Sequence, residues 1–133
     1  MKNNKELPSM DEWLEEAKAH PDSGKVGMYL FHNGVVRETS RAEARKHVKE
    51  DSKVKGMKFS FNREKASKVV EEAYRMDGIF YIKTWFNQGE LDVGDDIMYI
   101  LVGGDIRPNV IDALQFLVGK IKQECVSEIE HKE

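Results

Sequence analysis

The chain has few of the residues from which several kinds of site are built. It contains one cysteine, Cys125, among 133 residues, which excludes an internal disulfide and any cysteine-rich metal site. Its four histidines are scattered, and no spacing places two of them on one helix face. The signatures GxxxxGK[ST], GxGxxG, HExxH and CxxC are missing. We therefore predict neither a metal site nor a bound cofactor.

Long apolar runs and an excess of charge of one sign are also lacking. No apolar run approaches the roughly 18 residues of a membrane span, and the polar start of the chain is not followed by the apolar region of a secretion signal. The formal net charge is −3, from 21 basic and 24 acidic residues, so no overall field attracts nucleic acid. We expect a cytoplasmic protein that binds neither membranes nor nucleic acid.

What is present is the composition of one globular domain, 40% apolar and 34% charged. A chain of this length can bury a core of its own, so we expect a single domain over residues 1–133. Residues 1–8 are expected to be loose, and residues 38–56 to form a mobile surface excursion with a polar helix at 41–50. Residues 125–133 are expected to be a short C-terminal tail, with Cys125 partly buried in a helix.

The rest of the chain is organised around residues 89–126. The apolar run at 97–102 predicts a strand buried on both faces, which Gly103 and Gly104 are expected to end. Pro108 suits the first turn of a helix, and this helix carries an apolar stripe at Ile111, Leu114, Leu117, Val118 and Ile121. Lys122 lies at the edge of that stripe, where it can face either solvent or a cleft.

The N-terminal third predicts a helix followed by a strand. Ser9 and Glu12 have the spacing of a capping box, so a helix should run from there to about residue 20, with Trp13, Leu14 and Ala17 on its inner face. Residues 25–37 alternate as in a strand. Asn33-Gly34 is either a tight turn or a glycine bulge, and Arg37 follows the bend.

The middle of the chain predicts two strands and a helix. Alternating apolar residues indicate strands at 54–61 and 79–86. Asn62 can cap a helix from 63 to about 76, with Ala66, Val69, Val70 and Ala73 facing inward. With the other elements, this order predicts an α+β domain whose mixed, largely antiparallel sheet is packed against helices.

Gly103, Gly104 and Arg107 together have the pattern of an anion site. Glycines before a helix let a ligand approach the backbone, and the unpaired N–H groups of the helix start can bind a phosphate or a carboxylate. Arg107 adds a planar, charged donor, whereas Asp105 would repel an anion. A tight strand-to-helix turn without a ligand is the other interpretation of these residues.

Four segments in order carry a resemblance to a known family. They are GMYLFHNGVVR at 27–37, REKASKVVEEAYR at 63–75, GELDVGDDIMYILV at 89–102 and ALQFLVGKIK at 113–122. Together they resemble the catalytic subunit of molybdopterin synthase, the MoaE family, over roughly residues 24–124. The resemblance implies an α/β hammerhead-like fold with extra antiparallel strands, in a homodimer within a heterotetramer.

The resemblance also implies a reaction and residues that perform it. Members of this family receive the C-terminal tail of a small β-grasp, MoaD-like partner. Its thiocarboxylate supplies sulfur to cyclic pyranopterin monophosphate, which forms the dithiolene of molybdopterin. By position, Lys122 matches the catalytic lysine, Arg37 the arginine after the first strand and Arg107 the arginine at the helix start. Arginines suit the binding of phosphate and carboxylate groups.

Two positions depart from the family pattern. Ile106 stands where a histidine is usual, and Ile129 where a second active-site lysine is expected. These departures keep a second hypothesis open, in which the chain is a noncatalytic dimer of the same fold that binds a β-grasp partner or an anionic ligand. Turnover of substrate separates the two hypotheses.

Overall fold

The structure is a computed structural model that describes residues 7–40 and 53–132. Its elements in chain order are α1 (Met10–Ala19), the 3₁₀ turn η1 (Pro21–Lys25), β1 (Met28–Val35), β2 (Val54–Phe61), α3 (Arg63–Tyr74), β3 (Ile79–Phe86), β4 (Gly89–Asp92), β5 (Asp96–Gly104), α4 (Arg107–Lys120), the π-helical segment η2 (Ile121–Cys125) and β6 (Val126–Lys132). The helix predicted at 41–50 lies outside the described residues.

The strands form two three-stranded sheets in which every pairing is antiparallel, in the orders β1-β5-β3 and β4-β2-β6. The α+β prediction is confirmed. The prediction of a strand buried on both faces is also confirmed, because β5 is the central strand and is buried from Ile97 to Gly104. Gly103 and Gly104 are the last two residues of this strand, as predicted, and they pair with both neighbouring strands.

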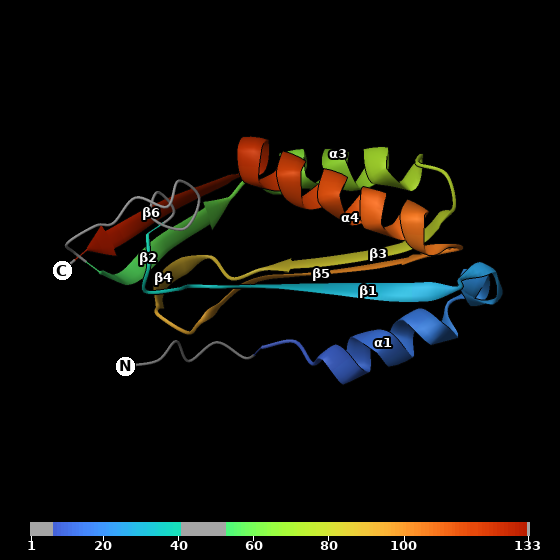
Figure 1. Cartoon of the computed structure of the whole chain (residues 1–133), viewed down its shortest axis with the longest axis horizontal. Coiled ribbons are helices and arrows are strands. Elements are labelled where there is room, and N and C mark those ends of the chain that lie inside the picture. The colour runs from blue at the N-terminus through green and yellow to red at the C-terminus, as the bar shows by residue number, and fades with distance from the viewer. Residues whose placement is uncertain (1–6, 41–52, 133) are drawn as a thin grey trace.

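Helices cover both faces of the first sheet: α3 and α4 lie on one face and α1 on the other (Figure 1). Side chains of β1 alternate between the two layers as predicted. Met28 and Leu30 pack against the core beneath α3 and α4, and Tyr29 and Phe31 pack against the α1 side. This alternation is what a strand covered on both faces requires.

The N-terminal helix begins and packs as its sequence predicts. Ser9 Oγ accepts a hydrogen bond from the backbone N–H of Glu12 at 3.3 Å, the N-cap bond of a helix start. Trp13 and Ala17 are buried against β5, and the Trp13 ring meets the Tyr99 ring edge-on at 5.9 Å. The aromatic layer between α1 and the sheet therefore fixes the position of this helix.

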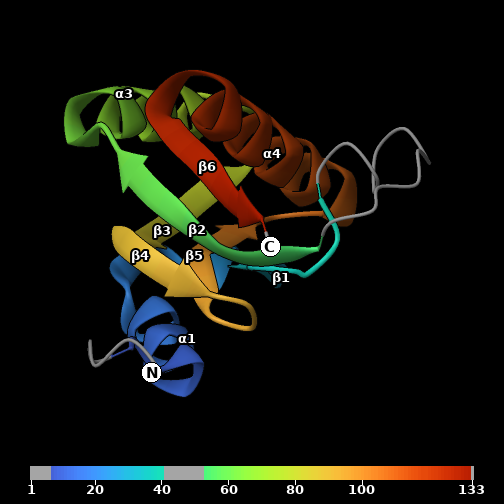
Figure 2. The same cartoon turned by 90° about the vertical axis from the view of Figure 1, so that its left-hand side faces the viewer.

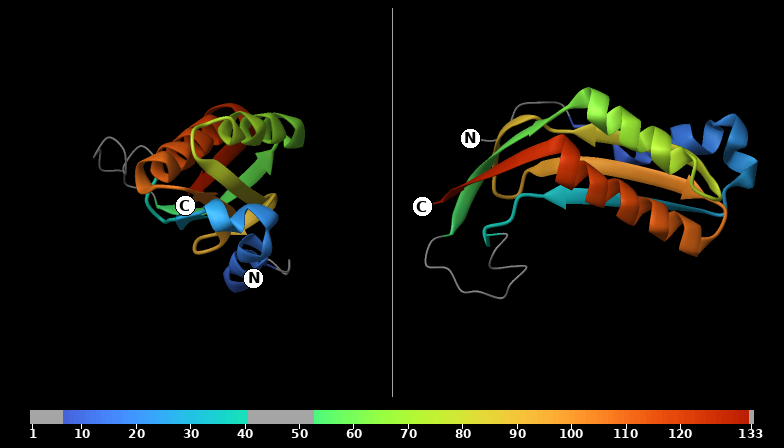
Figure 3. Two further views of the ribbon diagram at one scale, coloured as in Figure 1. Left: turned by 90° about the vertical axis from the view of Figure 1, so that its right-hand side faces the viewer. Right: turned by 90° about the horizontal axis from the view of Figure 1, so that it is seen from above.

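The buried stripe of α4 is rotated from the predicted one. Val110, Ala113, Leu117 and Ile121 are fully buried, whereas Ile111 is 37% exposed. The helix α4 packs on the sheet and against α3 at once (Figures 1 and 3), and the buried residues face these two contacts. The predicted helix is confirmed, but the prediction that Ile111 faces inward is wrong.

The second sheet lies at one end of the first (Figures 1 and 2). Residues 126–132, expected to be part of a short tail, form β6 and pair along the length of β2. The N–H of Asn62 donates to the carbonyl of Cys125 at 2.7 Å, which joins the start of α3 to the end of η2. The strand predicted at 54–61 is confirmed as β2, so residues 54–56 belong to this strand and not to the surface excursion in which they were also placed. No helix in the described ranges is long and apolar enough to cross a membrane.

Candidate functional site

A cavity of about 130 Å³ lies where the two sheets and the end of α4 meet. It is lined by His32, Gly34, Val35, Arg37, Met57, Ile97, Lys122, Glu128 and Glu130. Five of these residues carry groups that can be charged, from two distant parts of the chain. Folding therefore concentrates hydrogen-bonding and charged groups here, a combination typical of binding and catalytic sites.

The strand β1 bends where it reaches this cavity. Its register with β5 shifts between Gly34 and Val35, so the glycine bulge is confirmed and the alternative of a tight turn is not. Beyond the bulge Val36 is buried, and its N–H donates to the carbonyl of Asp95 at 3.0 Å. Arg37 is then exposed at the rim of the cavity, where its guanidinium can reach a ligand.

Lys122 faces the cavity rather than open solvent alone. Its side chain is 30% exposed, and Nζ lies 4.0 Å from Oε2 of Glu128, whose side chain is 4% exposed. Lys122 belongs to the π-helical segment that follows α4, and such segments occur frequently at functional sites. Of the two orientations that the sequence left open, the structure has the lysine at the mouth of a cleft.

His32 adds a titratable group that sequence analysis did not identify. Its Nε2 is buried and has no hydrogen-bond partner among the residues that the structure describes. Burial, and secondly the charge of Lys122, lower the pKa of His32 below its usual value, so the ring is neutral at pH 7. A neutral imidazole with an unused nitrogen can accept a proton from a ligand or donate one to it.

Glu128 and Glu130 are the other site residues that sequence analysis missed. They alternate on β6 toward the cavity, while Ile129 between them is 53% exposed. The usual pattern of a strand at the edge of a core puts apolar residues inside and acidic residues outside. Because β6 inverts this pattern, residues 125–133 gave no recognisable strand signal, although Glu-Ile-Glu does alternate.

The cavity is not lined by the other three predicted site residues, Arg107, Gly103 and Gly104. Arg107 begins α4 and Lys122 follows fifteen residues later, which corresponds to about 22 Å along a helix axis. A Cβ at Gly103 would lie 2.7 Å from the Tyr29 ring, and one at Gly104 would lie 2.6 Å from the carbonyl of Gly78. Both glycines thus lie in closely packed surroundings, whereas the sequence suggested either an anion site or a tight strand-to-helix turn.

The start of α4 already holds a carboxylate. Oδ1 of Asp105 accepts hydrogen bonds from the N–H of Ile106 at 2.6 Å and from Nδ2 of Asn109 at 2.9 Å. A negative group therefore occupies the region where an anion would bind. The described residues also contain no group of three or more His, Cys, Asp or Glu side chains arranged to hold a metal ion.

Comparison with protein-family models places most of the chain in one family. The family model described as MoaE protein matches residues 5–124. A protein of Methanocaldococcus jannaschii, described as uncharacterized, is 32% identical over 117 residues, which cover 86% of this chain and 88% of that protein.

Solved structures give the same fold. Molybdopterin synthase from Staphylococcus aureus matches with a TM-score of 0.72 at 17% identity, over 95% of this chain and 87% of that one. A chain in the complex of subunits 1 and 2 of molybdopterin-converting factor from Helicobacter pylori matches with a TM-score of 0.65 at 18% identity, over 91% of this chain and 74% of that one.

Proposed function

Because the chain belongs to the MoaE protein family, we propose that it works as the large subunit of a molybdopterin synthase in molybdenum cofactor biosynthesis. The observation that carries the proposal is the meeting of Lys122 and Arg37 in one cavity. These are two of the three basic residues that the family resemblance assigns to the active site. The proposal includes a cytoplasmic location and a homodimer.

The proposed reaction is the transfer of sulfur from a thiocarboxylate to cyclic pyranopterin monophosphate. The donor is the C-terminal tail of a small β-grasp partner, and a fold relative from Helicobacter pylori is described as part of a two-subunit complex. Two successive transfers would supply the two sulfur atoms of the dithiolene. The cavity would hold the end of the partner's tail, and cyclic pyranopterin monophosphate would lie over the rim of the cavity.

The cavity residues suit this chemistry. The ammonium group of Lys122 can hold the anionic thiocarboxylate and stabilise the oxyanion that develops at the acyl carbon as sulfur leaves. The guanidinium of Arg37 can bind the phosphate in a bidentate manner. His32, kept neutral by burial and by Lys122, can take up a proton released during the transfer.

One observation favours the second hypothesis, a noncatalytic binding protein. Glu128 and Glu130 bring two carboxylates to a cavity that also holds Lys122 and Arg37, so its positive charge is offset. An anionic tail and a phosphate would both be repelled by these carboxylates. Binding of a β-grasp partner through surfaces outside this cavity does not depend on that positive charge, so the carboxylates weigh against turnover more than against partner binding.

The experiment that decides is a reconstituted synthesis. Purified protein is mixed with a thiocarboxylated β-grasp partner from its own source and with cyclic pyranopterin monophosphate, and molybdopterin is followed by mass spectrometry. We expect product, and a loss of at least about 100-fold in rate for Lys122→Ala. Lys120→Ala is the matched control, because Lys120 pairs with Glu124 on the surface and does not line the cavity.

Two outcomes would count against the enzyme. Unchanged synthesis by Lys122→Ala would show that the roles assigned to the cavity are wrong. No synthesis by the native chain, with a partner that is active toward another large subunit, would leave the noncatalytic binding protein as the function.

A further inference from the structure

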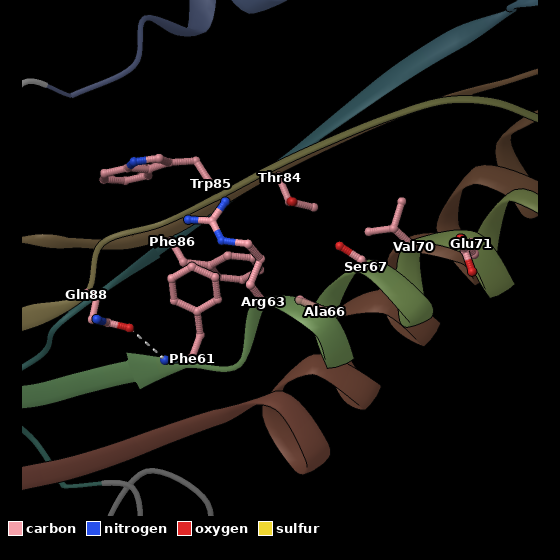
Figure 4. A pocket seen from close by; sticks show the side chains of 10 residues that line it. All are labelled: Phe61, Arg63, Ala66, Ser67, Val70, Glu71, Thr84, Trp85, Phe86 and Gln88. Carbon is pink, nitrogen blue, oxygen red and sulfur yellow. Dashed lines mark hydrogen bonds between the residues drawn. The ribbon is translucent and has the colours of Figure 1, made fainter.

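A second, larger hollow lies between α3 and the outer edge of β3 (Figure 4). This groove has a volume of about 850 Å³, and none of its lining residues lines the cavity of Lys122. Phe61, Phe86 and Val70 give it an apolar floor, and Arg63 and Glu71 stand at its sides. The proposed function makes no use of it.

One wall of the groove is the unpaired edge of a sheet. β3 pairs with β5 on one side, and among the described strands it has no neighbour on the other. An exposed edge presents backbone N–H and C=O groups that a further strand can bind. The pairing of β3 with β5 determines which residues of β3 have backbone groups that face outward.

Backbone groups of an antiparallel strand alternate between its two sides. The N–H of Asn87 donates to the carbonyl of Ile97 at 2.9 Å, so the backbone groups of Asn87 face β5. The N–H of Ile82 donates to Oη of Tyr74 at 2.8 Å, and the Tyr74 hydroxyl donates to the carbonyl of Ile82 at 3.3 Å. The backbone groups of Ile82 therefore face away from β5. Thr84 and Phe86 share the parity of Ile82, and their backbone groups therefore face the groove.

The groove is closed at one end and open over a short length. Tyr74 occupies the edge position at Ile82, which leaves Thr84 and Phe86 as the residues available for pairing. No other described residue forms a hydrogen bond with their outward backbone groups. At about 3.4 Å per residue, the open edge accommodates an extended segment of four or five residues.

The two charged residues of the groove, Arg63 and Glu71, lie at its opposite ends and can orient a bound segment. The Arg63 guanidinium lies 5.9 Å from the centre of the Phe61 ring, which in turn stacks on Phe86 with centroids 4.7 Å apart. No carboxylate in the described ranges forms an ion pair with Arg63. Glu71 lies eight residues further along α3, or about 12 Å, at the other end of the groove in Figure 4.

We propose that this groove binds an extended segment of a partner protein by strand addition to β3. The segment pairs antiparallel with Thr84 and Phe86, the more stable arrangement per residue. Because successive side chains of a strand point to opposite faces, three alternate residues of the segment face α3: an acidic residue beside Arg63, an apolar residue over Phe61 and Phe86, and a basic residue beside Glu71. Main-chain hydrogen bonds provide binding, and the two charges set the direction of the segment.

Amide hydrogen exchange of the native chain tests the geometry without a ligand. The outward amides of Thr84 and Phe86 should exchange rapidly, whereas the inward amides of Trp85 and Asn87 should be protected. Slow exchange at Thr84 and Phe86 that strengthens with protein concentration would mean that a second copy of the chain occupies the edge. That result would overturn the proposal of a foreign segment.

The binding test uses the peptide acetyl-Asp-Thr-Val-Thr-Lys-amide, whose Asp, Val and Lys side chains share one face of the strand, titrated into the ¹⁵N-labelled chain. We expect a dissociation constant between about 10 µM and 1 mM, with slowed exchange at Thr84 and Phe86. Methylation of the valine and lysine nitrogens, which pair with β3, should abolish binding. Methylation of both threonine nitrogens, which point away from β3, is the matched control and should leave binding intact.

Variants of the protein test the charge. Arg63→Gln should weaken peptide binding about fivefold, as expected for an exposed charge-assisted contact. Lys68→Gln, on an exposed position of α3 outside the groove, should not change it. No binding at about 5 mM peptide, or equal binding by both methylated peptides, would overturn the proposal. Neither result would bear on synthesis through Lys122, because the two sites share no residue.

Discussion

Two neighbouring glycines occupy places where a side chain does not fit. A Cβ at Gly104 would lie 2.6 Å from the carbonyl of Gly78 and 2.7 Å from Cγ2 of Val110. Since backbone and buried side chain both block it, Gly104→Ala should destabilise the fold by about 2 kcal/mol. Urea denaturation followed by circular dichroism measures this change in the free energy of unfolding.

Gly119 is the matched control for that substitution. It lies in α4 with nothing within 4 Å of the position of a Cβ. Alanine there restricts the unfolded chain and favours the helix, so Gly119→Ala should stabilise the protein by about 0.5–1 kcal/mol. If the two alanine variants had equal stability, the close packing at Gly104 would not be what requires its glycine.

His32 links the stability of the protein to pH. Burial and the nearby charge of Lys122 lower its pKa in the folded state, whereas in the unfolded chain it titrates near 6.5. Below that pH the unfolded state binds more protons than the folded state, so the free energy of unfolding falls on acidification. His32→Gln should lose less stability than the native chain between pH 7 and pH 5.

Urea titrations of both proteins at several pH values measure that difference. The other three histidines are present in both proteins, so the comparison isolates the effect of His32. Parallel pH profiles for the two proteins would contradict the assignment of a lowered pKa to His32.

At the scale of elements, Tyr74 connects α3 to β3. Its hydroxyl forms both hydrogen bonds of the outward backbone groups of Ile82. Tyr74→Phe removes these bonds and should reduce the free energy of unfolding by about 1 kcal/mol. Hydrogen exchange should quicken at the amide of Ile82 and stay unchanged at Trp85, whose amide points toward β5. Equal acceleration at both residues would indicate general loosening of the sheet instead.

The elements that sequence analysis predicted are those with strong local signals. α1 and α3 have side-chain caps at Ser9 and Asn62, and β5 is a continuous apolar run. The residue pattern did not give β4, which has four residues, or β6, whose acidic residues face inward. Their pairing with β2 depends on contacts between distant segments, which no local pattern encodes.

At the scale of the whole molecule, the candidate site is an assembly of segments that the sequence separates. The family resemblance selected Arg37 and Lys122, and folding places them in one cavity. His32, Glu128 and Glu130 could not be selected, because their orientation depends on the bulge in β1 and on the register of β6. Arg107 matched the family equally well, yet it starts α4 while Lys122 follows its end.

This separation makes a prediction about the proposed dimer. A span of about 22 Å prevents Arg107 and Lys122 of one chain from touching the same small substrate. If both take part in the proposed synthesis, each active site must combine Lys122 of one chain with Arg107 of another. Lys122→Ala and Arg107→Gln should then both be inactive alone and partly active when mixed and allowed to exchange subunits.

Mixing the two variants is expected to restore a defined fraction of the native activity. Random pairing of equal amounts makes half of the dimers mixed, and each mixed dimer has one intact site of two, so about one quarter of the native activity should return. The control mixes Lys122→Ala with a double variant that carries both substitutions, which can form no intact site. Absence of recovery despite demonstrated subunit exchange would exclude Arg107 from the site. Activity in Arg107→Gln alone would do the same, leaving Lys122 and Arg37 as the basic residues that handle the substrate.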